Sequence, residues 1–325
     1  MGNFEMLNEL RNSALVHEKK LSSYNHVSSF NFTNKTFWNQ HWTNISIKAR
    51  GLFIDTETAD IVARSYDKFF NVGEMPSTSI EELNKNMSPP FEVYIKENGY
   101  LGIASSYNGE LFAASKSTTE GSYAKKFKDI LLNTLGSVEC VNNFIRMCDN
   151  MNMSCIFEVI DPVDDPHIIK YDKKHVVLLD MVEKTYHFNR VPYYYMRNVL
   201  HIYGLDSIFE IKHDFGCEIN GISLKNVRFS KLYDSILLND RINEIEGVVV
   251  IDSNNNMVKI KSDKYRYLKA LRSIMYQLAI GKDENAIKTI SKYGIKKNII
   301  NMMKQYISNT DSPNIIEFND KFLHI

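Results

Sequence analysis

The chain has 325 residues, of which 44% are apolar and 24% are charged, and its 39 Lys and Arg residues balance its 39 Asp and Glu residues. This composition is typical of globular proteins and excludes a collagen-like or wholly disordered chain; the length suggests about two domains. Apolar runs such as Val248–Ile251 are far shorter than the roughly 18 residues that a membrane-spanning helix needs, so we expect no membrane contact. The N-terminus shows no basic segment followed by an apolar one, the pattern that predicts secretion. The four cysteines form no C-x-x-C or zinc pattern, so we expect a cytoplasmic protein with reduced thiols.

The first 117 residues are predicted to form one helix and then antiparallel strands. Residues 14–21 have helical spacing, whereas residues 22–36 are rich in Ser, Asn and Thr and predict a loop. Alternating apolar residues or short apolar runs predict five strands, at residues 45–54, 60–64, 91–95, 100–105 and 111–114. Asn-Gly turn signals follow the third and fourth of these strands, so we expect residues 91–117 to form an antiparallel meander.

The next part of the chain alternates between helical and extended patterns. Helices are predicted at residues 123–135, 141–151, 192–203 and 233–243, and strands at 154–160, 176–182, 246–252 and 257–261. From Asp263 onward the apolar residues are spaced as in helices, with a break at Gly281. We therefore predict an α+β protein with two domains, one over residues 1–262 and a small helical one over residues 263–325.

The region around the start of the second predicted domain is basic. Residues 256–306 contain twelve Lys or Arg and three Asp or Glu. Four tyrosines lie among these charges: Tyr265, Tyr267, Tyr276 and Tyr293. Cationic and aromatic residues together suit single-stranded nucleic acid, although the same pattern is compatible with a solvated helix face and tyrosine packing. A contact with RNA, including Lys296 and Lys297, is our prediction for this region.

Short segments elsewhere carry residue types suited to phosphoryl transfer. A lysine at a strand end, as in Lys96-Glu97-Asn98-Gly99, can attack phosphorus once burial or nearby cations lower its pKa. Carboxylates in or before apolar strands, as in Phe157-Glu158 and Glu246-Gly247, can hold a ribose hydroxyl or a metal ion. Alternate lysines on one strand face, as in Lys259-Ile260-Lys261, can contact one phosphate. Each segment taken alone is better explained as an ordinary turn or surface sequence than as part of a catalytic site.

The order and spacing of these segments are more specific than any one of them. Two further segments lie upstream, Ala49-Arg50-Gly51-Leu52-Phe53 and Lys68-Phe69-Phe70-Asn71, and an Arg can bind two phosphate oxygens at once. Together the segments resemble the covalent nucleotidyltransferase superfamily, which contains polynucleotide ligases and mRNA capping enzymes. The upstream pair narrows the resemblance to the ATP-dependent RNA ligase 1 family of bacteriophage T4 type, over about Arg50 to Lys261.

This resemblance implies a nucleotidyltransferase fold, ATP-grasp-like, with antiparallel sheets flanked by helices, and it assigns site residues. Lys96 would form the lysyl-AMP intermediate, Glu158 would contact the ribose and the metal, and Glu246 would hold the metal. Lys259 and Lys261 would contact the α-phosphate. The other nucleotide-binding positions that the family implies are Arg50, Lys68, Ile95, Gly99, Lys116 and Gly247.

The resemblance also implies a reaction that joins 5′-phosphate and 3′-hydroxyl RNA ends with ATP and with Mg²⁺ or, in its place, Mn²⁺. The role that it implies is RNA repair, such as tRNA repair, in the cytoplasm, or in the host cytoplasm for a viral protein. Asn98 departs from the Asp of many members, and this loss of charge should slightly favour a neutral Lys96. Alternatives are an inactive RNA-binding relative, or a nucleotidyltransferase acting on DNA or mRNA caps. The helical pattern after residue 262 argues against the last two, which usually carry a β-barrel there. The oligomeric state stays open.

Overall fold

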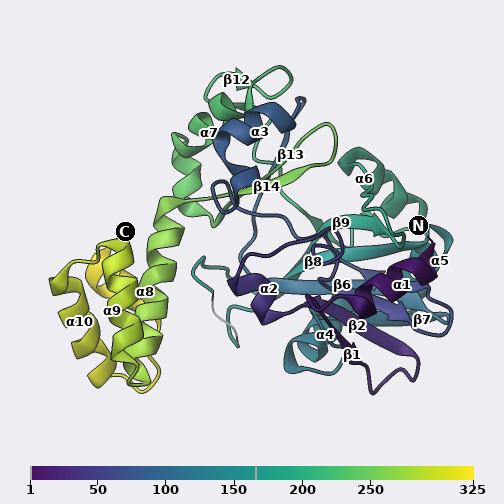
Figure 1. Cartoon of the computed structure of the whole chain (residues 1–325), viewed down its shortest axis with the longest axis horizontal. Helices are drawn as coiled ribbons and strands as arrows, with labels where there is room; N and C mark the ends of the chain where they lie inside the picture. The colour runs from purple at the N-terminus through teal and green to yellow at the C-terminus, as the bar shows by residue number, and fades with distance from the viewer. Residues whose placement is uncertain (1, 165–166) are drawn as a thin grey trace.

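The protein, in a computed structural model that describes residues 2–164 and 167–325, is built on three main sheets and a C-terminal group of helices (Figure 1). The first sheet is antiparallel and has the order β1 (Val16–Lys20), β2 (Val27–Phe32), β3 (Leu52–Asp55) and β4 (Ile61–Arg64). The second sheet has the order β10 (Glu210–Ile211), β9 (His175–Glu183), β8 (Met153–Ile160), β6 (Tyr100–Tyr107) and β7 (Glu110–Ala114). The third sheet has the order β14 (Met257–Lys261), β13 (Gly247–Ile251) and β5 (Glu92–Ile95).

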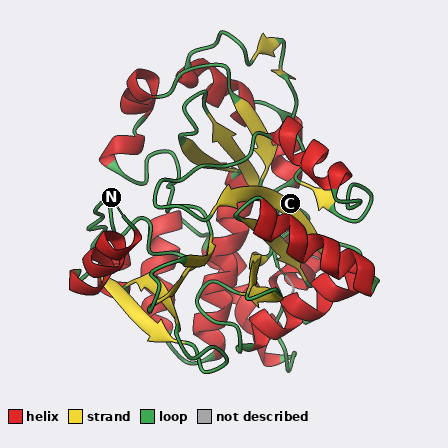
Figure 2. Cartoon of the chain, turned by 90° about the vertical axis from the view of Figure 1, so that its right-hand side faces the viewer, coloured by secondary structure: helices red, strands yellow, loops and turns green. Residues whose placement is uncertain are grey.

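Helices surround these sheets, as Figure 2 shows by colour. Those before residue 262 are α1 (Asn3–Asn12), α2 (Asn34–Trp38), α3 (Ile80–Asn86), α4 (Ser122–Leu135), α5 (Val138–Asn150), α6 (Tyr193–Ile202) and α7 (Phe229–Leu237). The C-terminal group contains α8 (Asp263–Ala279), α9 (Asp283–Tyr293), α10 (Lys297–Ser308) and α11 (Ile315–Phe318). A small hairpin joins β11 (Glu218–Ile219) to β12 (Ile222–Ser223). Among the described residues, no helix combines the length and apolar character that crossing a bilayer requires.

Separate apolar cores hold the sheets and the helix group together. The second sheet packs on α4, α5 and α6 through fully buried rings such as Phe127, Phe144 and Phe157. The third sheet packs on α3 and α7 through residues such as Val248 and Leu232. Burying one such side chain stabilises the fold by roughly 1.5–3 kcal/mol. The C-terminal helices form a core of their own, which Ile168 joins from outside the group.

The predicted α+β fold with antiparallel sheets and C-terminal helices is confirmed, but several element predictions are wrong. Residues 14–21 are not helical: β1 lies there and pairs with β2, so sheet pairing overrides the helical spacing. The Ser-rich segment contains β2 itself, whose small Ser28 and Ser29 are buried. The predicted strand at 45–54 begins only at Leu52, because residues 44–48 form turns.

The predicted meander over residues 91–117 is half right. The hairpin at Asn108-Gly109 forms between β6 and β7, with positive φ at both turn residues. By contrast, β5 pairs with β13 of the third sheet, and β6 pairs with β8 of the second sheet. The segment between β5 and β6 therefore passes from one sheet to another and makes no hairpin turn. Its four residues, 96–99, enter the space between the two sheets.

The helix predicted at 233–243 begins earlier, at Phe229, and gives way to a 3-10 turn at Asp240–Glu244. The other predicted helices and strands lie within a few residues of their expected bounds. The expected boundary near residue 262 coincides with Ser262, which caps α8 by accepting a hydrogen bond from the backbone N–H of Tyr265. Whether the two parts are separate domains in the sense of independent folding stays a prediction.

Candidate active site

A pocket of about 470 Å³ lies where the third sheet meets the second sheet and the loops around β3 and β7. Eight of the predicted site residues line it: Arg50, Lys68, Ile95, Lys96, Gly99, Lys116, Glu158 and Lys259. Three others do not line it but lie beside it, namely Glu246, Gly247 and Lys261 on the edges of β13 and β14. The pairing of β5 with β13 thus brings distant segments of the chain to one cavity, and a bridge between Asn71 and Lys259 adds the segment that contains Lys68.

Glu246 is the centre of the ionic contacts at one end of the pocket. It directly precedes β13 and is 3% exposed, so its charge requires partners. Lys96 Nζ lies 3.1 Å from Glu246 Oε2, and Lys261 Nζ lies 2.7 Å from Oε1. These two lysines hold the pKa of Glu246 below its ordinary value in spite of burial, which acts in the opposite direction. Glu246 is therefore a carboxylate shared by two lysines.

The pKa of Lys96 is the first point at which the site departs from expectation. Burial lowers this pKa, but the carboxylates of Glu246 and Glu158 outweigh burial and the pKa lies above its ordinary value. The expectation of a neutral amine is therefore wrong for the protein without ligands. The physical reason is that two carboxylates face Lys96 before any phosphate or metal ion is there to compete for them.

Asn98 contacts the carboxylate that pairs with Lys96, and its expected small effect on the pKa of Lys96 stays a prediction. Its side-chain N–H donates to Glu246 Oε2 at 2.8 Å, the oxygen that also pairs with Lys96, so it favours the charged carboxylate. The same group donates to the hydroxyl of Tyr265 on α8 at 3.2 Å, and the amide oxygen accepts from the backbone N–H groups of residues 168 and 169, each at 3.1 Å. Asn98 is a buried link between the site and the C-terminal helices.

Five further cations line the pocket. Lys212 pairs with Asp180, and Lys68 Nζ lies 3.7 Å from Glu74 Oε1. Burial lowers the pKa of Arg50, Lys68, Lys116 and Lys259, and each lysine is lowered further by neighbouring cations. The effect is largest at Lys259, where burial and then the charges of Lys68, Lys96 and Arg50 lower the pKa from 10.5 to about 6. Such a cluster of crowded cations is suited to a polyphosphate, whose charge relieves their mutual repulsion.

Close backbone packing explains two of the predicted glycines. A Cβ at Gly99 would lie 2.1 Å from the carbonyl oxygen of Val159, and a Cβ at Gly247 would lie 2.1 Å from that of Ile260. Gly247 also has a φ of +151°, which other residues rarely adopt. The backbone N–H of Gly99 donates to Glu158 Oε1 at 2.8 Å. At both positions the absence of a side chain thus allows a close approach to the backbone of a neighbouring strand.

The carboxylates of Glu158 and Glu246 could bind a metal ion only if substrate phosphates supplied further ligands. Among the described residues there is no group of three or more His, Cys, Asp or Glu placed to hold a metal ion. Mg²⁺ in nucleotide enzymes is commonly held by one or two carboxylates together with substrate phosphates and water. Glu158 and Glu246 supply that number of carboxylates, and burial raises the pKa of Glu158, as Glu246 does to a smaller extent. A nearby divalent cation would favour the ionised form of Glu158.

The other end of the pocket is lined by polar residues that no sequence pattern predicted. Asp180 on β9 is buried there and accepts from Tyr66 hydroxyl at 2.5 Å and from Lys212 Nζ at 2.7 Å. Lys212 Nζ also lies 4.0 Å from the centre of the Tyr94 ring. All four residues line the pocket. No spacing or motif marks them, because they come from four separate segments that only the second and third sheets bring together.

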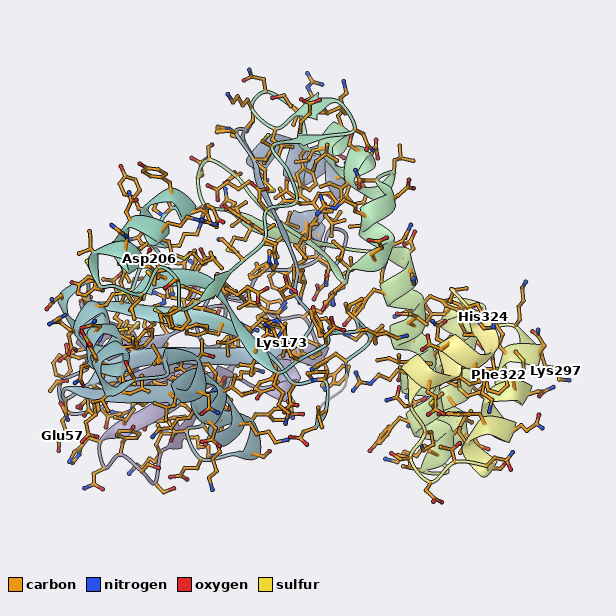
Figure 3. All side chains as sticks on the ribbon, turned by 180° about the vertical axis from the view of Figure 1, so that it is seen from behind. Glu57, Lys173, Asp206, Lys297, Phe322 and His324 are labelled. Carbon is orange, nitrogen blue, oxygen red and sulfur yellow. The ribbon has the colours of Figure 1, made fainter. Side chains whose placement is uncertain are left out.

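The tyrosines of the basic region divide into two groups. Tyr265 is 5% exposed and contacts Asn98, so the expectation that it belongs to an RNA-contacting face is wrong. Tyr276 and Tyr293 are exposed, at 65% and 43%. All ten Lys and Arg residues from Arg266 onward are exposed, on the C-terminal helices or directly beside them. Lys297 lies on the side of this group that is farthest from the sheets (Figure 3).

Comparisons with known proteins agree with this geometry. The model of an RNA ligase family, that of the bacteriophage T4 RNA ligase 1 type, matches residues 48–265, which contain every predicted site residue. The chain is 28% identical to tRNA ligase 1 of Schizosaccharomyces pombe over 147 residues, which cover 40% of this chain and 18% of that protein. It is 25% identical to the tRNA ligase of Candida albicans over 293 residues, which cover 78% of this chain and 33% of that protein.

The similarities differ in how much of each known protein the chain covers and in whether they concern sequence or fold. The chain spans about a fifth to a third of the length of the curated relatives that it matches. Among solved structures, an archaeal ATP-dependent RNA ligase superposes with a TM-score of 0.54 at 15% identity, over 94% of this chain and 75% of that chain. At this identity the superposition shows a shared fold. The expected nucleotidyltransferase architecture is confirmed by it.

Proposed function

This chain belongs to the RNA ligase family of bacteriophage T4 RNA ligase 1 type, and from that premise we propose that it joins 5′-phosphate and 3′-hydroxyl ends of RNA at the expense of ATP, through AMP bound covalently to Lys96. The observation that carries the proposal is the position of Lys96. Its amine lies in a pocket with five further cations and 3.1 Å from a carboxylate that pairs with a second lysine. This combines a nucleophile with a site for the phosphates that it would attack.

Three transfers would follow one another at this site. Lys96 Nζ attacks the α-phosphorus of ATP, loses its proton, and pyrophosphate leaves with the electron pair of the broken P–O bond. An oxygen of the RNA 5′-phosphate then attacks the same phosphorus, and the P–N bond to Lys96 breaks as the amine regains a proton. Finally the 3′-hydroxyl oxygen attacks the activated RNA phosphate, loses its proton, and AMP leaves with the electron pair.

The other residues have roles that follow from their placement. Arg50, Lys68 and Lys116 would hold the outer phosphates, and Lys259 and Lys261 would hold the α-phosphate. Glu158 would position the ribose, and Glu246 together with Glu158 would hold a magnesium or manganese ion in contact with the phosphates. That ion would supply positive charge at the phosphates and would compete with Lys96 for its two carboxylates, which lowers the pKa of the amine.

The exposed basic residues of α8, α9 and α10 support a second part of the proposal. We propose that this face contacts the RNA backbone, which would bind with an affinity that falls as salt increases. The similarity to proteins named tRNA ligases makes repair of broken tRNA the physiological role that we propose, in the cytoplasm of the cell or of a host. Residues 263–323 are helical in the structure and not a β-barrel, which favours RNA over the DNA and cap alternatives.

The test is covalent labelling by ATP that is radioactive in its α-phosphate, with magnesium or manganese, followed by a denaturing gel. We expect label on the unaltered protein and none on Lys96→Ala. Lys128→Ala is a matched control, because Lys128 is an exposed lysine on α4 away from the pocket. Labelling that survives in Lys96→Ala would overturn the proposal. No labelling of any of the three, before or after pyrophosphate treatment, would instead favour an inactive RNA-binding relative.

A further inference from the structure

An aromatic strip at the mouth of the pocket has no role in the fold's cores or in the reaction as described so far. We define this strip by five residues: Phe32, Phe37, Trp38, Trp42 and Phe70. Their rings contact one another in sequence, from Trp38 to Phe37 at 5.2 Å, to Phe32 at 6.3 Å, to Trp42 at 4.9 Å and to Phe70 at 5.2 Å between ring centres. Two of them, Phe32 and Phe37, line the pocket. The strip thus leads from the pocket to the surface.

The outer end of the strip is open to solvent. Phe37 is 43% exposed and Trp38 is 77% exposed, both on the short helix α2 (Figure 1). The helix packs little of its own: Thr36 is its one buried residue. Exposed Trp and Phe side by side are unfavourable for a surface that only meets water, and large exposed aromatic groups mark binding sites. Nothing in the packing of α2 requires a tryptophan at position 38.

Two lysines connect the strip to the phosphate-binding cations. Lys116 Nζ lies 4.4 Å from the centre of the Phe32 ring, and Lys68 Nζ lies 3.8 Å from that of Phe70 and 5.3 Å from that of Trp42. Both lysines line the pocket, and burial lowers the pKa of each. An anion at Lys68 and Lys116 would therefore have aromatic rings directly beside it. A nucleotide presents that pairing, a phosphate with a planar base one sugar away.

The proposed reaction indicates which nucleotide would place its phosphate at Lys68 and Lys116 and its base at the aromatic strip. In phosphoryl transfer the attacking and the leaving groups lie roughly in line on opposite sides of the phosphorus. Lys96 therefore attacks opposite the leaving pyrophosphate, and the RNA 5′-phosphate must later attack opposite Lys96. The RNA phosphate thus enters where pyrophosphate was, at the cations Arg50, Lys68 and Lys116. The rest of the RNA 5′ end has to extend outward from there.

From this placement we propose that the aromatic strip binds the 5′-terminal bases of the RNA by stacking, with Trp38 as the outermost ring. The inference rests on the proposed function and adds a binding site for the 5′-phosphate strand, separate from the basic face of the C-terminal helices. Stacking is tolerant of sequence, since every base has an aromatic face. Recognition at the strip would therefore select for the presence of a base and not for its identity.

The fluorescence of Trp38 can show whether RNA binds at the aromatic strip. The chain contains two tryptophans, so Trp42→Phe leaves Trp38 as the sole indole fluorophore and keeps an aromatic ring at position 42. The probes are a short 5′-phosphorylated single-stranded RNA and an abasic strand of the same length and charge. We expect saturable quenching of Trp38 fluorescence by the RNA and little quenching by the abasic strand. Equal quenching by both, or quenching by ATP alone to the same extent, would overturn the inference.

A kinetic test in the otherwise unaltered protein does not depend on the fluorescent variant. Trp38→Ala is expected to raise the KM for 5′-phosphorylated RNA by about tenfold, the loss of one stacked base, and Trp38→Phe should restore most of it. Tyr194→Ala removes an equally exposed aromatic residue from α6 and should leave the KM unchanged. Covalent labelling of Lys96 by ATP is measured in parallel, because Trp38 does not line the pocket.

The outcomes separate this inference from the function on which it rests. If the unaltered protein is not labelled by ATP, the proposed function fails and the inference with it. If labelling is normal but Trp38→Ala leaves the KM for RNA unchanged, only the inference fails. A dimer in solution that Trp38→Ala converts to a monomer would also overturn it, because the exposed rings would then bury each other between two copies.

Discussion

Two regions of this protein are rich in lysine and arginine, and they differ in what surrounds the charges. In the pocket, six cations line one cavity, and burial lowers the pKa of all except Lys96. Neighbouring cations lower the pKa of Lys68, Lys116 and Lys259 further. On α8–α10 the basic side chains are spread over an exposed helical surface. In the pocket, the cations therefore repel one another at short range, and a bound phosphate would reduce this repulsion. On the helices, the positive charge is spread over a larger surface.

This difference predicts two kinds of nucleic-acid or nucleotide binding. Charges in a pocket act on a few phosphate oxygens at fixed positions, and each one matters individually. Charges on an exposed face act together through the ionic atmosphere, so each contributes little and salt weakens the sum. Single substitutions should consequently have large effects in the pocket and small effects on the helices. The following variants test this contrast in order of expected size.

The largest effect is expected for Glu246→Gln. The variant leaves the half-buried amines of Lys96 and Lys261 without their shared carboxylate and removes a candidate metal ligand. We expect the rate of lysine adenylylation to fall by about a hundredfold or more, as for loss of one preorganised electrostatic contact. Initial labelling rates with ATP measure this. Glu244→Gln alters an exposed glutamate two residues away and is the control; a similar loss in both would remove Glu246 from the site.

The second largest effect is expected for Asn98→Asp, which should lower the stability of the fold. The new carboxylate would lie against Glu246 Oε2, which now accepts from Asn98 at 2.8 Å. Replacing this hydrogen bond by a buried repulsion should lower the free energy of unfolding by about 1–3 kcal/mol. The loss should shrink as the pH falls from 8 to 5, because repulsion raises the pKa of the carboxyl pair and protonation then relieves it. Denaturant unfolding at both pH values is the measurement, and a loss independent of pH would contradict this explanation.

The next effect is a gain in stability from Lys259→Met. The pKa of Lys259 falls from 10.5 to about 6 on folding, so between these values the unfolded chain binds more protons and the lysine destabilises the fold. The penalty is largest near pH 6 and fades as the pH rises toward 10. We therefore expect Lys259→Met to raise Tm most at pH 6–7 and least at pH 10. Lys128→Met is the control at an exposed site, and a gain that does not change with pH would contradict the crowding of charge at Lys259.

The smallest effect is expected on the helices. Replacing Lys296 and Lys297 together by Ala should weaken RNA binding only a few-fold at moderate salt and lower the salt dependence of log K by about two phosphate contacts at most. Labelling of Lys96 by ATP should not change. Fluorescence anisotropy of RNA at several salt concentrations measures this. An unchanged affinity and slope would remove this part of the helical face from the RNA-binding surface.

Local patterns predicted most of the elements that are decided by their own residues. The apolar run of β13, the amphipathic helices α4 and α5 and the Asn-Gly hairpin of β6 and β7 were all found in this way. Elements whose structure depends on a distant partner were missed. β1 and β2 form because they pair with each other and with β3, although their residues favour a helix and a loop.

The site shows the same division. The sequence by itself determined the family, the candidate nucleophile and the cations, because their order along the chain and the short motifs around them are local properties. Only the tertiary structure decided that Glu246 is shared by two lysines, that Asn98 bonds to Glu246 and Tyr265, and that the pKa of Lys96 is raised. Charge states depend on burial and on groups within a few ångströms, and the pairing of β5 with β13 brings Lys96 to Glu246 although the two are distant in the sequence.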